Sequence, residues 1–351
     1  MKKLYAAITV LFVLLFVFQA CDNKIQSRGK VRNIVVVADS ALWSRVDSMV
    51  TAKLCPERFT PQPENIFVLN QIPPQNLGRL KRYPQVLFIG TLDMGGTTKT
   101  LLDQMLPPQS HARELVESGE RFFYEVDEPW SKNQLLGVLV ANDEASLVEQ
   151  FNANGDQVFN AFDEHANLRA EQQVYYREYQ KDLTKQLMDS SGWSVNVPLS
   201  WFIAIDDPEA RVAWLRKMNP QRELFVYWEP VQDPSILSKE WMVDTRNRLS
   251  KQYFEGDYIY SDSTVKVVES TVNFLDRYCI KLEGIWQNDS LVAGGPFRSY
   301  GFYNEGDGRM YLIDLSVFAP EERKWLYLRQ LDAVAKTFKT RNETDKSRSK
   351  P

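Results

Sequence analysis

The first half of the chain alternates apolar runs with amphipathic segments. Residues 33–38 form a continuous β-branched run, which is typical of a strand buried on both faces. Asp39 and Ser40 then supply a helix N-cap, and apolar residues recur at helical spacing up to Cys55-Pro56. Further strands are expected at residues 66–69, 86–89 and 134–141. The alternation predicts an α/β domain over residues 33–190, with a mainly parallel sheet covered by helices.

A long helical pattern closes this half. It begins after Asn142, is expected to break at Asn154-Gly155, and then resumes to about Met188. Apolar and aromatic residues four positions apart would form one face of the resumed helix: Tyr175, Tyr179, Leu183 and Leu187.

From Trp193 onward, strands follow strands. They are expected at residues 199–205, 211–218, 223–229, 278–287, 297–303 and 309–318. One helix carries Trp241 and Leu249, and a last helix opens at Pro320. The order predicts an α+β domain over residues 193–339, an antiparallel sheet with packed helices. Seven of the nine tryptophans fall here, and most should be core residues because each buries a large area.

Both ends of the chain have a distinct composition. Met1-Lys2-Lys3 is basic, residues 4–18 are apolar, and Ala20-Cys21 has the form of a lipobox, although Phe18 departs from that pattern. We therefore expect residues 1–20 to be a signal peptide and Cys21 to carry acyl chains such as palmitate. An uncleaved anchor is the alternative, but the run is short for a membrane span. Residues 21–32 are expected to be a lipidated tether, and residues 340–351 a polar tail.

Charge and residue counts exclude several functions. The signal holds only Lys2 and Lys3 as charges, so the remainder carries 40 Lys and Arg against 46 Asp and Glu. An acidic chain outside the cytoplasm is not expected to bind nucleic acid. Two histidines, both expected on solvated surface, exclude a multi-His metal site, and no metal or cofactor is expected. Cys55 and Cys279 could form one disulfide or remain two buried free thiols.

Motifs for chemistry are incomplete. Gly90–Lys99 lacks the Lys-Ser/Thr pair that a phosphate loop needs, and the chain has no Gly-x-Ser-x-Gly elbow. The most unusual stretch is Gly294-Gly295, which precedes a strand with Arg298 and Tyr300 on one face. Asp314, across the hairpin, could pair with one of the residues on this face. We expect either a salt bridge at the start of this strand or a ligand or partner patch formed by Trp286, Arg298, Tyr300 and Asp314.

Two groups of motifs resemble known families. Residues 192–201 and 308–312, with the closing Thr337-Phe338, resemble the two ends of PsbP-like domains. Residues 294–297, 311–314, 317–320 and 328–333 resemble a family of Bacteroidota lipoproteins described only as a domain of unknown function. PsbP-like proteins are mostly accessory or assembly factors, so the resemblance implies binding rather than catalysis.

The combined interpretation is a lipid-anchored cell-envelope protein with a non-enzymatic binding or assembly role. It would be held by Cys21 at the outer membrane, on the periplasmic or surface face, with an envelope protein or a glycan as partner. One alternative is a glycan-binding lipoprotein that uses exposed aromatic side chains. Another is an envelope hydrolase without a recognisable motif.

Overall fold

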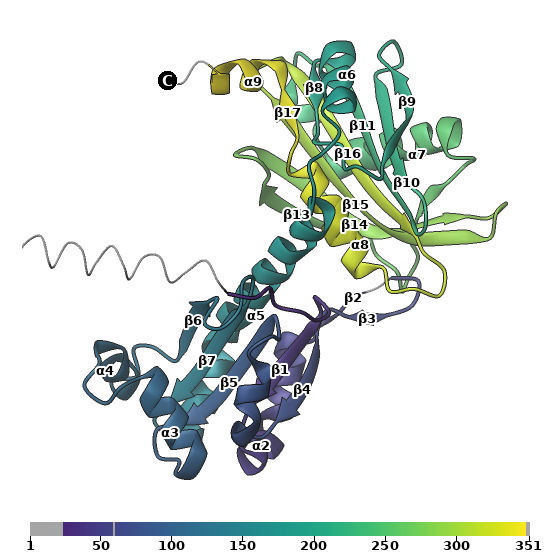
Figure 1. The fold of residues 1–351 in the computed structure, drawn as a ribbon. Coiled ribbons are helices and arrows are strands. Elements are labelled where there is room, and N and C mark those ends of the chain that lie inside the picture. The colour runs from purple at the N-terminus through teal and green to yellow at the C-terminus, as the bar shows by residue number, and fades with distance from the viewer. Residues whose placement is uncertain (1–23, 59, 349–351) are drawn as a thin grey trace, which may run out of the picture. The chain divides into compact units, whose positions relative to one another are not determined.

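The computed structural model describes residues 24–58 and 60–348, which belong to two compact units (Figure 1). Of the described residues, the first unit comprises 24–56 together with Phe67–His165. The second comprises those within Glu57–Ile66 and 166–348. The predicted fold class, a parallel α/β sheet followed by an antiparallel sheet with helices, is confirmed.

The first unit is built on a five-stranded sheet in the order β4-β1-β5-β7-β6. Neighbouring strands are parallel except β6, which pairs antiparallel with β7 at one edge. The strands are β1 (Asn33–Val37), β4 (Val68–Ile72), β5 (Gln85–Thr91), β6 (Phe123–Asp127) and β7 (Leu135–Ala141). The helices are α2 (Ser40–Leu54), the 3-10 helix η2 (Pro74–Leu80), α3 (Gly96–Met105), α4 (His111–Glu117) and α5 (Glu144–Val174), of which the residues up to His165 belong to this unit.

Hydrophobic patterning explains these elements. β5 and β7 are buried along their whole length, as continuous apolar strands of a covered parallel sheet should be. The predicted N-cap of α2 is confirmed, because the Asp39 carboxylate accepts hydrogen bonds from the backbone N–H groups of Ala41 and Leu42.

The predicted break at Asn154-Gly155 is wrong, because α5 is one helix of 31 residues. A Cβ at Gly155 would lie 3.3 Å from side-chain atoms of Lys53 and Phe151, so this glycine serves close packing rather than a turn. The interruption comes later, between Val174 and α6 (Lys181–Ser191). Leu187 of α6 belongs to a core of the second unit, so the units differ in their bounds from the predicted ranges 33–190 and 193–339.

The second unit contains an antiparallel sheet in the order β12-β14-β15-β16-β11-β10-β9, and β13 also pairs with β14. Its strands are β9 (Phe202–Asp207), β10 (Val212–Lys217), β11 (Gln221–Pro230), β12 (Tyr258–Tyr260), β13 (Val268–Asn273), β14 (Tyr278–Asn288), β15 (Ala293–Asn304) and β16 (Arg309–Phe318). Two short pairs accompany it: β2 (Glu57–Arg58) with β3 (Glu64–Asn65), and β8 (Trp193–Ser194) with β17 (Lys339–Thr340).

Each face of this sheet carries its own core. Met242 and Leu249 of α7 (Lys239–Tyr253), which follows the 3-10 helix η3 (Pro234–Ile236), pack on one face. Leu331 and Val334 of α8 (Trp325–Ala335) pack on the other. The Glu64 carboxylate accepts hydrogen bonds from the N–H groups of Lys324 and Trp325, at 2.7 and 3.3 Å. This contact with the N-terminus of α8 explains why Glu57–Ile66 belongs to the second unit.

Two predicted loose segments are ordered where the structure describes them. In the expected tether, Gln26 forms a parallel bridge with Lys132, and the Ser27 hydroxyl donates to the Asn133 carbonyl at 2.6 Å. In the expected tail, residues Arg341–Arg348 form α9, whose Glu343 pairs with Arg277. The predicted signal peptide and Cys21 lie outside the described residues. Among the described residues, no helix is long and apolar enough to cross a membrane.

Candidate binding pocket

The four residues of the predicted patch do not share a surface. Side chains alternate between the faces of a strand. Trp286 belongs to the core on the α7 face, where Asp314 pairs with Arg246 of α7. Arg298 and Tyr300 lie on the α8 face, and all four residues are buried. The sequence placed Asp314 across the hairpin from Arg298 or Tyr300, but its register partner is Ser299. The patch prediction is therefore corrected.

Arg298 is the centre of a buried ionic network. Its Nε donates to Glu283 at 2.9 Å, Nη1 donates to Asp332 of α8, and the Tyr300 hydroxyl donates to Asp332 at 2.9 Å. Burial opposes ionisation of Glu283, but the charges of Arg298 and Lys281 outweigh it and lower the pKa of that carboxyl to about 2. Burial raises the pKa of Tyr300 to about 12. The network ties β14 and β15 to α8, and Arg298 forms its ion pairs with Glu283 and Asp332 rather than with Asp314.

Asp314 forms a separate pair on the opposite face. Its Oδ2 accepts from Arg246 Nε at 2.9 Å and from the Ser299 hydroxyl at 2.5 Å. Full burial raises the pKa of Asp314, although Arg246 partly offsets this effect. The pair holds α7 to the centre of the sheet.

The Gly294-Gly295 motif serves strand packing. A Cβ on Gly295 would lie 1.8 Å from the Val317 carbonyl oxygen and 3.0 Å from Trp286 Nε1. Only glycine allows β15 to approach β16 and the indole this closely. The role of Gly295 is therefore a close backbone approach.

Beside Trp286, however, the α7 face opens into a cavity of about 450 Å³, which we call the aromatic pocket. Strands β10, β11, β14, β15 and β16 and the end of α7 contribute to it. Its lining residues are Trp214, Arg216, Gln221, Glu223, Tyr253, Phe254, Glu255, Asp257, Trp286, Leu291, Ala293 and Phe318. Of the predicted patch, Trp286 alone lines this pocket. The other lining residues were missed because strands distant in sequence bring them together.

Aromatic rings form much of the wall. Trp214 packs edge to face on Phe254, with ring centroids 4.3 Å apart, and the ring centroids of Trp286 and Phe318 are 6.2 Å apart. The Arg216 guanidinium covers Trp214 at 4.4 Å from the ring centroid. Among the described residues, neither Trp214 nor Trp286 has a hydrogen-bond acceptor for its buried indole N–H.

Carboxylates are concentrated among these rings. Glu223 is buried, lies 3.1 Å from Arg216 Nε, and accepts a hydrogen bond from Gln221 Nε2 at 2.6 Å. Asp257 accepts from Asn288 Nδ2 at 2.7 Å. Burial is the largest cause that raises the pKa of both Glu223 and Asp257. The lining therefore contains three acidic side chains, Glu223, Glu255 and Asp257, and one arginine, Arg216.

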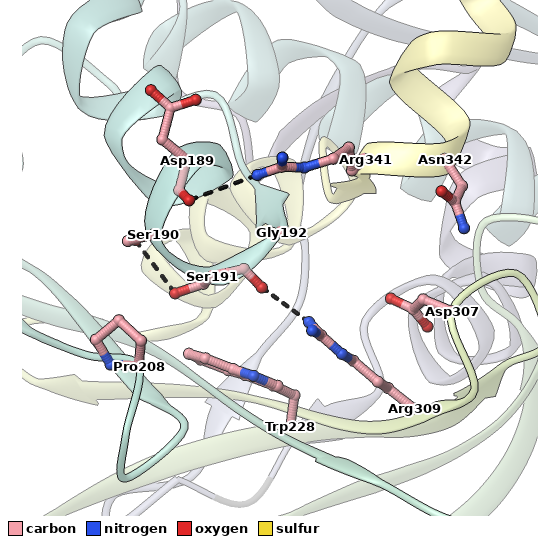
Figure 2. A pocket seen from close by; sticks show the side chains of 10 residues that line it. All are labelled: Asp189, Ser190, Ser191, Gly192, Pro208, Trp228, Asp307, Arg309, Arg341 and Asn342. Atoms are coloured by element: carbon pink, nitrogen blue, oxygen red, sulfur yellow. Dashed lines mark hydrogen bonds between the residues drawn. The ribbon is translucent and has the colours of Figure 1, made fainter.

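A second cavity, the polar pocket of about 380 Å³, lies beside the C-terminus of α6 (Figure 2). Arg309 Nη1 donates to the Ser191 carbonyl at 2.8 Å, and Arg341 Nη2 donates to the Met188 carbonyl at 2.7 Å. Figure 2 shows both guanidinium groups directed at this helix end, where cations are stabilised by the helix dipole. Because its cations already cap α6, the polar pocket is the weaker candidate for a ligand.

The remaining candidate groups offer little chemistry. His111 is exposed as expected, whereas His165 is buried, contrary to the prediction of a solvated surface. Cys55 and Cys279 are free, buried thiols, and burial raises their pKa to about 11 and about 12. In the part of the chain that the structure describes, no group of three His, Cys, Asp or Glu residues could hold a metal ion.

Two family matches cover most of the chain. Residues 27–175 match a domain of unknown function (DUF8532), and residues 180–337 match a domain of unknown function (DUF4837). The boundary between the matches falls in the segment that joins α5 to α6. No curated protein matches the chain. The resemblance to PsbP-like domains and to Bacteroidota lipoproteins stays a prediction.

Solved structures show only weak similarity. LpqN of Mycobacterium tuberculosis, involved in cell envelope biogenesis, is 9% identical, with 42% of this chain and 81% of that chain covered and a TM-score of 0.30. A protein of Bacteroides thetaiotaomicron VPI-5482 is 11% identical, with 44% and 46% covered and a TM-score of 0.26. Human STARD10 is 8% identical, with 46% and 81% covered and a TM-score of 0.21. At these TM-scores the similarity carries no inference about this chain.

Proposed function

We propose that this chain is a lipid-anchored protein of the bacterial cell envelope with a non-enzymatic binding role, and that its second unit holds the ligand or partner group. The signal sequence and Cys21 support the anchor, and the expected location is the outer membrane. The observation that carries the binding role is the aromatic pocket, whose volume lies in the range of small-ligand sites.

The pocket has the composition of a recognition site. Its aromatic walls offer large apolar surfaces, while Glu223, Asp257 and Arg216 offer fixed polar groups among them. Fixed polar groups within an apolar wall determine which ligand is bound and in what orientation.

A hydrolase is the alternative that two carboxylates with raised pKa suggest. Both groups, however, already accept hydrogen bonds inside the protein: Glu223 from Gln221 and Asp257 from Asn288. A general acid or base must be free to reach the substrate's reacting atom. The internal partners therefore favour binding over catalysis.

Glycan binding through exposed aromatic side chains has less support. Every tryptophan of the chain is buried or half-buried. Recognition by tryptophan would therefore take place in a pocket rather than on an open surface.

Site-specific photocrosslinking in cells tests the proposal. Leu291, at the rim of the aromatic pocket, is 58% exposed and would carry the photoreactive group in the full chain. We expect one discrete adduct with an envelope component in the membrane fraction, and its loss when Trp286→Ala is added. The same group at Tyr176, which is 71% exposed and outside the pocket, is the control. Equal adducts at both positions, or none at Leu291, would contradict a binding role for the pocket.

A further inference from the structure

We infer that the aromatic pocket binds a sugar ring, at the end of a glycan or in a short saccharide. This inference rests on the proposed binding role and names the class of ligand for the same pocket. It follows from the hydrogen-bonding groups that the pocket presents.

The lining offers donors and acceptors together. The half-buried Arg216 guanidinium and Gln221 carboxamide line the cavity and carry N–H donors. Glu223 and Asp257 are carboxylate acceptors that line the same cavity. Leaving a buried donor unpaired costs free energy, so a fitting ligand supplies acceptors as well as donors.

Hydroxyl groups meet both requirements, because each donates one hydrogen bond and accepts others. An ammonium ligand would suit the acidic lining and the aromatic rings, but it only donates hydrogen bonds and carries the same charge as the Arg216 guanidinium in the lining. An apolar chain would leave Glu223 and Asp257 facing hydrocarbon, which is unfavourable for polar groups. Saccharides combine hydroxyl groups with apolar C–H faces that can pack on aromatic rings.

Access and size fit this class of ligand. The cavity of about 450 Å³ lies in the range of small-ligand sites, and the exposed Leu291 lies on its rim. Trp286 and Phe318, with interplanar angle 55°, provide two differently oriented ring surfaces. The pocket would therefore accept one end of a saccharide, with the remainder in solvent.

The test titrates the detergent-solubilised full chain with four probes and follows tryptophan fluorescence and calorimetric heat. The probes are the N-acetylglucosamine tetramer, maltotetraose, choline and laurate. We expect one of the two saccharides to bind saturably, whereas choline and laurate do not.

Three variants locate the site. Gln221→Met removes the carboxamide N–H groups and keeps a side chain of similar length, so it should weaken saccharide binding about twofold to tenfold, the effect of one hydrogen bond. Glu223→Gln should also weaken it. Gln186→Met is the matched control, because Gln186 lies outside the lining and its Nε2 donates to Asp206 at 2.9 Å. It should leave the affinity unchanged.

The outcomes separate this inference from the proposed function. Choline or laurate binding that Gln221→Met or Glu223→Gln weakens, with neither saccharide bound, would overturn the sugar assignment and leave the binding role standing. Saccharide binding unaffected by both pocket variants would overturn the site. No binding of any probe, together with no Leu291 adduct, would overturn both. Cleavage of a bound saccharide, abolished by Glu223→Gln, would support the sugar assignment and overturn the non-enzymatic role.

Discussion

Replacing Arg298 with Ala should destabilise the second unit rather than disturb a surface site. The side chain is buried and forms ion pairs with two carboxylates, Glu283 and Asp332, that lie on different elements. Removing one partner of a buried ionic network leaves uncompensated charge, which typically costs about 3–5 kcal/mol. For a unit of this size, that loss lowers the unfolding midpoint by roughly 6–20 °C.

Thermal unfolding followed by tryptophan fluorescence measures this effect, because seven of the nine tryptophans lie in the second unit. Lys185→Ala is the control: its ion pair with Asp189 is exposed, with side-chain exposures of 74% and 59%. Such a pair contributes about 0–1 kcal/mol, so the midpoint should hardly move.

A second comparison separates charge from packing. Adding Glu283→Gln and Asp332→Asn to Arg298→Ala removes the unpaired charges, so part of the lost stability should return. If Arg298→Ala unfolds at the wild-type temperature, the assignment of Arg298 to a structural network is refuted. If the triple variant is no more stable than Arg298→Ala, buried charge is not the cause.

Three further predictions follow from particular residues. Cys21→Ala should release the protein from the membrane fraction or leave the precursor unprocessed; a processed variant that still sediments with membranes would contradict the anchor. Gly295→Ala should destabilise the fold by more than about 3 kcal/mol, because its Cβ would overlap the Val317 carbonyl oxygen, whereas Gly78→Ala has open space around it and should unfold like wild type in a circular-dichroism melt. Glu283, whose folded pKa of about 2 lies below its ordinary 4.5, contributes stability that is fully present above pH 4.5 and is lost as the pH falls toward 2. By linkage this contribution is about 3 kcal/mol. The unfolding midpoint of a Glu283→Gln variant should therefore fall less steeply between pH 4.5 and pH 2 than that of the wild type. Equal slopes for the two proteins in this pH range would contradict the lowered pKa of Glu283.

Local sequence determined most of the secondary structure. The apolar run at 33–38 gave a buried parallel strand, and Asp39 caps the helix after it, because burial and capping depend on neighbouring residues. Local pattern was insufficient at Gly155, where packing against Lys53 keeps α5 continuous through a residue that usually favours a break.

Tertiary structure decided the candidate site. The sequence grouped Trp286, Arg298, Tyr300 and Asp314, but strand register divides them between two faces of one sheet. A shift of one residue in strand register moves a side chain to the other face of the sheet. No local sequence pattern shows which residue of a distant strand will pair with a given residue. The aromatic pocket depends on the same long-range pairing, since Trp214 and Trp286 line one cavity only after five strands and α7 assemble. The chain thus specified its strands and helices locally, while the order and register of the sheet determined which aromatic and acidic side chains share a cavity.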